Sequence, residues 1–94
     1  GPIRLDIEHQ KVRCMNQSGK LTPHLMRLLR LLMEHPGEVV ERERLFREVW
    51  ETEYTADTRT LDVHISWLRR IIETDPRHPR FIKTVRGVGY RLDV

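Results

Sequence analysis

The segment "DTRTLDVHISWLRRIIETDP", residues 57–76, is the most strongly periodic stretch of this 94-residue chain. Its leucines and isoleucines recur in steps of three and four residues, which places them along one seam of a helix. The seam consists of Leu61, Ile65, Leu68 and Ile72. The segment predicts a helix over residues 58–74 that begins at Asp57 or Thr58 and ends before Pro76.

The opposite face of this helix is unusual for a surface that meets only water. At about 100° per residue, it combines a large aromatic ring, two cations and a small apolar side chain. This outward face consists of Arg59, Val63, Ser66, Trp67 and Arg70. Its flanks are formed by Asp62 and Arg69 on one side and by His64 and Ile71 on the other. The helix is therefore a candidate binding surface.

Two further helices precede this segment. In "LTPHLMRLLRLLMEHPG", residues 21–37, Thr22 is a predicted N-cap, Pro23 suits the first helical position, and the Pro-Gly pair ends the helix. In "EVVERERLFREVW", residues 38–50, apolar side chains gather on one side of a second, shorter helix. These side chains are Leu45, Phe46, Val49 and Trp50. The acidic residues 51–57 lack apolar spacing and indicate an exposed loop.

Strand patterns lie at both ends of the chain. Near the start, apolar and polar residues alternate around "EHQK" and "NQSG", two predicted turns, which indicates a small antiparallel sheet. The apolar positions are Ile3, Leu5, Ile7, Val12 and Cys14. At the other end, "RFIKTVRGVGYRLDV" predicts a hairpin over residues 81–92. Gly87 and Gly89 allow positive φ in its turn and keep bulk away from the tip, where Arg86 projects.

The order of these elements defines the fold class. A small sheet, three helices with the third exposed, and a hairpin with cations at its tip form the α+β order of a winged helix-turn-helix. Gly1 and Pro2 have the form of a protease-cleavage remnant, so we expect the domain to cover residues 3–94 of a longer protein.

Composition and charge narrow the function. Apolar residues make up 38% of the chain, and no apolar run approaches the roughly 18 residues that a membrane span needs. The net charge is +3, yet residues 38–57 carry seven acidic and three basic side chains, whereas residues 77–94 carry one acidic and five basic ones. Such a basic segment favours a polyanion, and a merely solvated surface is the alternative.

The sequence offers no cofactor, metal or catalytic motif. Cys14 is the single cysteine, which excludes an internal disulfide, and we interpret it as a small strand residue. The five histidines lack the spacing of zinc ligands. An enzymatic interpretation requires an activity that depends on His64 or Cys14.

Double-stranded DNA fits the basic segment and the exposed helix, since cations that meet phosphates supply affinity and side chains that reach bases supply specificity. The candidate phosphate-binding cations are Arg59, Arg69, Arg70, Lys83 and Arg86, with Arg80 or Arg91 in addition. Neutralising about four to six phosphates predicts a slope of roughly −4 to −5 for log K against log[salt]. Val63 suits a thymine methyl group, and Trp67 either stacks along the sugar-phosphate edge or leans on the wing. A winged helix that docks on protein through residues 51–57 is the alternative, and it lacks this steep salt dependence.

Four motifs together resemble the DNA-binding effector domain of OmpR/PhoB-type response regulators. They are "LTP" before the first helix, "VV.R..L...VW" in the second, "TRTLDVHISWLRR" in the third and "FIKTVRGVGYRL" in the hairpin. The resemblance implies a phosphorylation-controlled bacterial transcription factor of the cytoplasm whose receiver domain precedes this one. It also implies that helix 58–74 enters the major groove, that wing 81–92 reaches the minor groove, and that two copies bind direct repeats in tandem.

The resemblance also assigns roles by position. It implies phosphate contacts for Arg59, His64 and Arg69, base-facing positions for Val63, Ser66 and Trp67, and wing contacts for Thr84 and Arg86. A loop that engages RNA polymerase in some members corresponds to Glu51, Thr52, Glu53, Tyr54, Thr55, Ala56 and Asp57. The chain departs from the pattern at Leu25, where many members carry the glutamate of a capping box. It departs again at Ser66 and Trp67, which often include a basic residue, so no member's target sequence is transferred.

Overall fold

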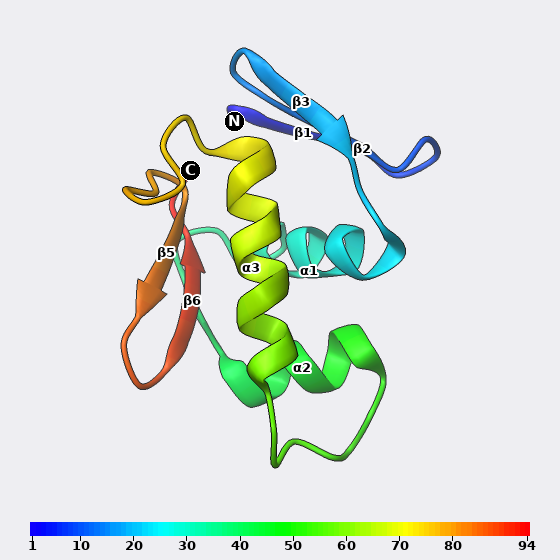
Figure 1. The fold of residues 1–94 in the computed structure, drawn as a ribbon, viewed down its shortest axis with the longest axis vertical. Helices are drawn as coiled ribbons and strands as arrows, with labels where there is room; N and C mark the ends of the chain where they lie inside the picture. The colour runs from blue at the N-terminus through cyan, green and yellow to red at the C-terminus, as the bar shows by residue number, and fades with distance from the viewer.

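The computed structural model describes residues 1–94 and contains three helices and two three-stranded antiparallel sheets (Figure 1). The first sheet has the order β1-β2-β3, formed by Ile3–Asp6, Lys11–Cys14 and Gln17–Lys20. The second has the order β4-β6-β5, formed by Val39–Glu41, Gly89–Leu92 and Ile82–Val85. The helices are α1 (Pro23–Met33), α2 (Arg42–Trp50) and α3 (Arg59–Ile72). The predicted α+β fold, with an N-terminal sheet, three helices and a C-terminal hairpin, is confirmed.

The predicted helix 58–74 corresponds to α3, which runs past both sheets along the long axis of the domain (Figure 1). Its predicted seam is buried, with no side chain of the four more than 1% exposed. The first helix begins as predicted, because Thr22 Oγ1 accepts a hydrogen bond from the Leu25 N–H at 3.2 Å and Pro23 occupies the first turn. The core that these helices share positions the opposite face of α3 toward solvent.

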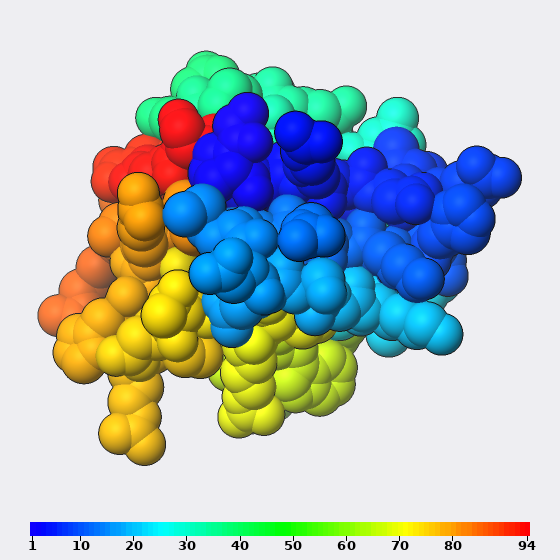
Figure 2. Space-filling model, turned by 90° about the horizontal axis from the view of Figure 1, so that it is seen from above, coloured from blue at the N-terminus to red at the C-terminus, as the bar shows by residue number.

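The N-terminal sheet covers the C-terminal end of α3. Figure 2 views the domain from this side and shows the N-terminal strands (blue) beside the last residues of the chain (red) and over the end of α3 (yellow). At the contact, a Cβ atom on Gly19 of β3 would lie 2.9 Å from Cγ2 of Ile71. The glycine therefore allows β3 to approach α3 closely.

Two predictions within the N-terminal sheet are wrong. The turn predicted at "NQSG" lies at Met15 and Asn16 instead, and Gln17–Lys20 forms β3, paired with β2. Ile7, predicted to point inward, lies in the turn after β1 and is 47% exposed. Because β3 is polar and contains Gly19, it has no apolar alternation, and the sequence gives no strand signal there.

The second sheet, which includes the wing strands β5 and β6, contains a further strand that the sequence pattern does not separate from the second helix. Val39–Glu41 forms β4, which pairs with β6, so α2 begins at Arg42. Gly89 of β6 packs on this strand, and a Cβ atom there would lie 2.0 Å from the Val40 carbonyl oxygen. Positive φ, predicted at both wing glycines, is found at Gly87 (+77°) and not at Gly89. The close approach to β4 is what requires glycine at position 89.

Candidate nucleic-acid interface

The outward face of α3 is exposed as the helix geometry predicts. Val63 and Trp67 have exposed fractions of 45% and 44%, although large apolar side chains usually lie inside. Arg59, Ser66 and Arg70 on the same face are also exposed. The five side chains form one continuous strip, because they are spaced in steps of one, three and four residues.

Arg59 begins α3 and is paired with the loop before it. Its Nε and Nη2 atoms donate hydrogen bonds to the Asp57 carboxylate, at distances down to 2.6 Å. These bonds lower the pKa of Asp57 to about 2 and raise the pKa of Arg59. The Arg59 side chain is 88% exposed, so the pair lies in water and is readily exchanged for another anion.

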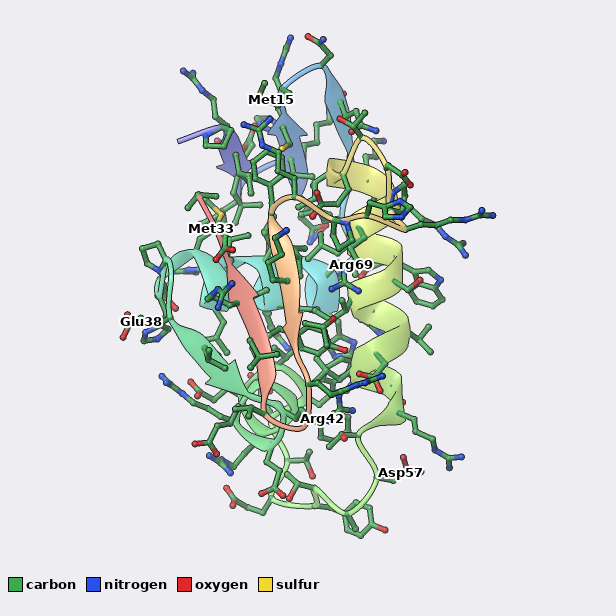
Figure 3. The ribbon with its side chains drawn as sticks, turned by 90° about the vertical axis from the view of Figure 1, so that its left-hand side faces the viewer. Met15, Met33, Glu38, Arg42, Asp57 and Arg69 are labelled. Atoms are coloured by element: carbon green, nitrogen blue, oxygen red, sulfur yellow. The ribbon has the colours of Figure 1, made fainter.

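Arg69 lies on the flank of α3 that faces the hairpin (Figure 3). Its Nε and Nη2 atoms donate hydrogen bonds to the Ile82 carbonyl oxygen, at 3.1 and 2.8 Å, and Nη2 also donates to Thr84 Oγ1 at 2.8 Å. The guanidinium carbon lies 5.7 Å from the centre of the Tyr90 ring. The structure thus brings together two predicted site residues, Arg69 and Thr84, through a contact that the sequence did not indicate.

A second link between α3 and the hairpin is formed by Asp62. Its carboxylate accepts hydrogen bonds from Arg42 of α2, at 2.7 and 2.8 Å, and from the Tyr90 hydroxyl of β6. The Arg42 bonds lower the pKa of Asp62, while burial and the Asp62 carboxylate raise the pKa of Tyr90. Figure 3 shows Arg42 beside the turn of the hairpin. The predicted flank residue Asp62 therefore holds α3 to α2 and to β6.

His64 and Trp67 belong to a ladder of aromatic rings drawn from all three helices. The Trp67 ring centre lies 4.9 Å from that of His64, which lies 4.8 Å from that of Trp50 in an edge-to-face contact. Trp50 contacts in turn His24 of α1 and Phe46 of α2. Since His64 lies on the flank opposite Arg69, the Trp67 ring leans away from the wing. The interpretation in which it packs on the wing is wrong.

The wing tip carries an unpaired cation. Arg86 lies exposed in the turn between β5 and β6, and neither Arg86 nor Arg70 forms an ion pair within the protein. Arg91, a lesser candidate for DNA contact, is paired with Asp93 at 2.6 Å. Both unpaired cations thus remain available to an external anion.

A winged fold with this exposed helix is shared with known regulators. Residues 16–92 match the family described as "Transcriptional regulatory protein, C terminal". The chain belongs to this family. It is 42% identical over 93 residues to the sensory transduction protein RegX3 of Mycobacterium tuberculosis, an alignment that covers 99% of this chain and 41% of RegX3. The chain spans 35 to 41% of the length of the first three curated relatives that it matches.

Solved structures of regulators in this family have the same fold. The response regulator DrrB of Thermotoga maritima, an OmpR/PhoB homolog, matches with a TM-score of 0.84 at 34% identity, over 100% of this chain and 42% of DrrB. The DNA-binding domain of RstA from Klebsiella pneumoniae, solved in complex with the RstA box, matches with a TM-score of 0.83 at 28% identity, over 99% of this chain and 92% of that one. The resemblance to OmpR/PhoB-type effector domains is confirmed.

In this regulatory domain the wing is also anchored by Glu73, which the sequence analysis missed. The Glu73 side chain follows α3, is 1% exposed, and accepts hydrogen bonds from the backbone N–H groups of Arg80, Phe81 and Ile82, at 2.7 to 3.1 Å. A charge-assisted bond to a backbone donor is stronger than a neutral one. The carboxylate therefore fixes the start of β5 against the end of α3.

The predicted partner loop, residues 51–57, lies at the end of the regulatory domain opposite the N-terminal sheet (Figure 1). Tyr54 in its centre is 68% exposed, and its N–H donates a hydrogen bond to Thr52 Oγ1 at 3.1 Å.

None of the three helices is both long and apolar enough to cross a membrane. The structure contains no group of three or more side chains suited to holding a metal ion.

Proposed function

We propose that this domain binds double-stranded DNA in a sequence-specific manner as the effector domain of a response regulator, with α3 in the major groove and the β5–β6 wing toward the minor groove. The observation that carries the proposal is the exposed strip on α3, which joins the cations Arg59 and Arg70 to the exposed side chains of Val63, Ser66 and Trp67. The likeness to the RstA domain, itself solved with DNA, supports it.

Within this proposal, the cations supply affinity. Arg70 and Arg86 are unpaired, Arg59 exchanges Asp57 for a phosphate, and Arg69 still has Nη1 free while its other nitrogens hold the wing. His64 donates Nδ1–H to the Thr60 carbonyl oxygen at 2.9 Å, so it can donate to the proposed phosphate through Nε2 only as the imidazolium, in which both ring nitrogens carry a proton. These groups and Lys83 support the predicted slope of roughly −4 to −5 for log K against log[salt].

Specificity is assigned to the base-facing positions and the wing. Val63, Ser66 and Trp67 point into the major groove, where each base pair presents a distinct edge. Arg86, at a turn that Gly87 keeps narrow, reaches into the minor groove, and Thr84 supports Arg69 beside it. The function so described is binding, and no catalytic step is assigned to His64 or Cys14.

The wider role is proposed from the family. Residues 3–94 form the effector domain, and a receiver domain controlled by phosphorylation regulates it in the cytoplasm of a bacterium. Two copies occupy direct repeats in tandem. The exposed loop at residues 51–57 contacts RNA polymerase.

Selection from randomised duplex DNA, sequenced after binding at two salt concentrations, tests the proposal. We expect enrichment of two similar half-sites, repeated head to tail about one helical turn apart, with affinity that falls steeply as salt rises. An unenriched pool, or binding that is indifferent to salt, would show that α3 docks on protein instead.

A further inference from the structure

Val63 and Trp67 form an exposed apolar patch on the face of α3 that is proposed to enter the major groove. They are four residues apart, on adjacent turns, and each leaves almost half of its surface in water. The cations around them are accounted for by phosphates, whereas two apolar side chains at the centre of a polar interface need an apolar partner. The patch therefore indicates a feature of DNA that is itself apolar.

The Trp67 ring is held in place on its other side. His64 contacts it at 4.9 Å, and the His64 ring is itself fixed by the Nδ1–H bond to the Thr60 carbonyl and by edge-to-face packing on Trp50. A ring supported in this way loses little conformational freedom when it meets a ligand. His64 is thus a positioning residue for Trp67.

The edges of the base pairs in the major groove limit the choice of partner. Guanine, cytosine and adenine present hydrogen-bond donors and acceptors there, and only thymine adds an apolar group, the methyl on C5. Neither side chain of the patch can make a bidentate hydrogen bond to a base. Contact with a methyl group is what their chemistry permits.

We propose that Val63 and Trp67 read the 5-methyl groups of thymine, and that the His64–Trp50 ring ladder sets the angle at which Trp67 does so. This inference rests on the proposed binding of α3 in the major groove. It makes thymine at one or two positions of each half-site a determinant of affinity, independent of the shape of the duplex.

Parallel selections with two libraries test this inference. One library is amplified with thymidine triphosphate and the other with deoxyuridine triphosphate, which pairs in the same way and lacks the methyl group. We expect a thymine preference in the first library to disappear in the second at the positions that α3 reads. Replacing one such thymine by uracil in the selected site should weaken binding about fourfold, the effect of losing one buried methyl group.

Variants assign the effect to the patch. Val63→Ala and Trp67→Leu should bring the ratio of the uracil and thymine dissociation constants toward one. His64→Ala should lower the same ratio, and His64→Phe, which keeps a ring against Trp67, should restore it. Val39→Ala removes an equally apolar exposed side chain from β4 and should leave the ratio unchanged.

The outcomes separate this inference from the function on which it rests. If neither library is enriched, the domain does not read DNA, and both proposals fail. If both libraries yield the same motif with equal affinity for thymine and uracil, DNA binding stands and methyl recognition is overturned. A ratio that survives Val63→Ala and Trp67→Leu in folded protein, verified by thermal unfolding, also overturns it.

Discussion

The Arg69 guanidinium on α3 donates two hydrogen bonds to the carbonyl oxygen of Ile82, the first residue of β5. A third bond reaches the Thr84 hydroxyl. Because the guanidinium is planar and fork-shaped, it fixes the direction of β5 in a way that a single ammonium cannot. Arg69 therefore positions the wing in addition to offering Nη1 to DNA.

We expect Arg69→Lys to preserve most of the salt dependence of DNA binding while weakening affinity about tenfold, because the charge remains and the hold on β5 is lost. Arg69→Ala should remove both the charge and the hold on β5, and it should make the slope of log K against log[salt] shallower by about 1. Anisotropy titrations on the selected site at several salt concentrations measure the two effects. Full recovery of affinity by lysine would show that charge alone matters.

Glu73→Ala should destabilise the domain strongly. The change removes the acceptor of three backbone N–H groups, of which those of Phe81 and Ile82 are buried, and each unsatisfied buried donor costs about 1 to 3 kcal/mol. We expect the free energy of unfolding in urea to fall by at least about 2 kcal/mol. The matched control is Glu34→Ala at the exposed end of α1, which should stay within about 0.5 kcal/mol of the parent. Equal losses in the two variants would contradict the anchoring role.

The two wing glycines should respond differently to alanine. Gly87→Ala adds a side chain in open space at positive φ, so we expect a loss of about 1 to 2 kcal/mol. Gly89→Ala forces a Cβ atom onto the Val40 carbonyl and should disrupt the pairing of β4 with β6, at a greater cost. Thermal unfolding of both variants compares the losses. A milder effect at position 89 would argue against the observed packing.

Arg86→Ala should weaken DNA binding chiefly on sites with A·T-rich flanks, where the narrow minor groove is most electronegative. Arg30→Ala, an exposed cation on α1 outside the interface, serves as the control and should have little effect. Affinities on matched sites that differ only in their flanks provide the measurement. Unchanged binding by Arg86→Ala at low salt would remove the wing from the interface.

The sequence predicted the helices well, because their signals are local. The α3 seam follows from spacing alone, and the start of α1 from the Thr22-Pro23 pair. The missed strands have other causes. β3 pairs with its neighbour β2 but is polar and lacks apolar alternation, and its packing depends on the fit of Gly19 under Ile71. β4 depends on pairing with β6 near the end of the chain. No local pattern encodes either contact.

The same division applies to the candidate site. Helix periodicity was enough to find the exposed strip, including Val63 and Trp67. The bonds of Arg69 and Glu73 to β5 could not be predicted, because they depend on where the chain passes after leaving α3. Pairing of Arg42 with Asp62 joins residues on different helices and likewise requires the fold.

Arg69, Asp62 and Glu73 tie α3 to the wing at three points, so the protein sets the distance between its two proposed DNA contacts. A site whose grooves do not match this distance has to bend or twist to meet it, at a cost that depends on the stiffness of its base steps. We expect preferences at base pairs that no side chain touches, and tighter binding to stiff sites once a nick relaxes them between the two grooves. Unaltered affinity for nicked DNA would contradict this. In such a complex the duplex deforms, and the spacing between α3 and the wing stays fixed.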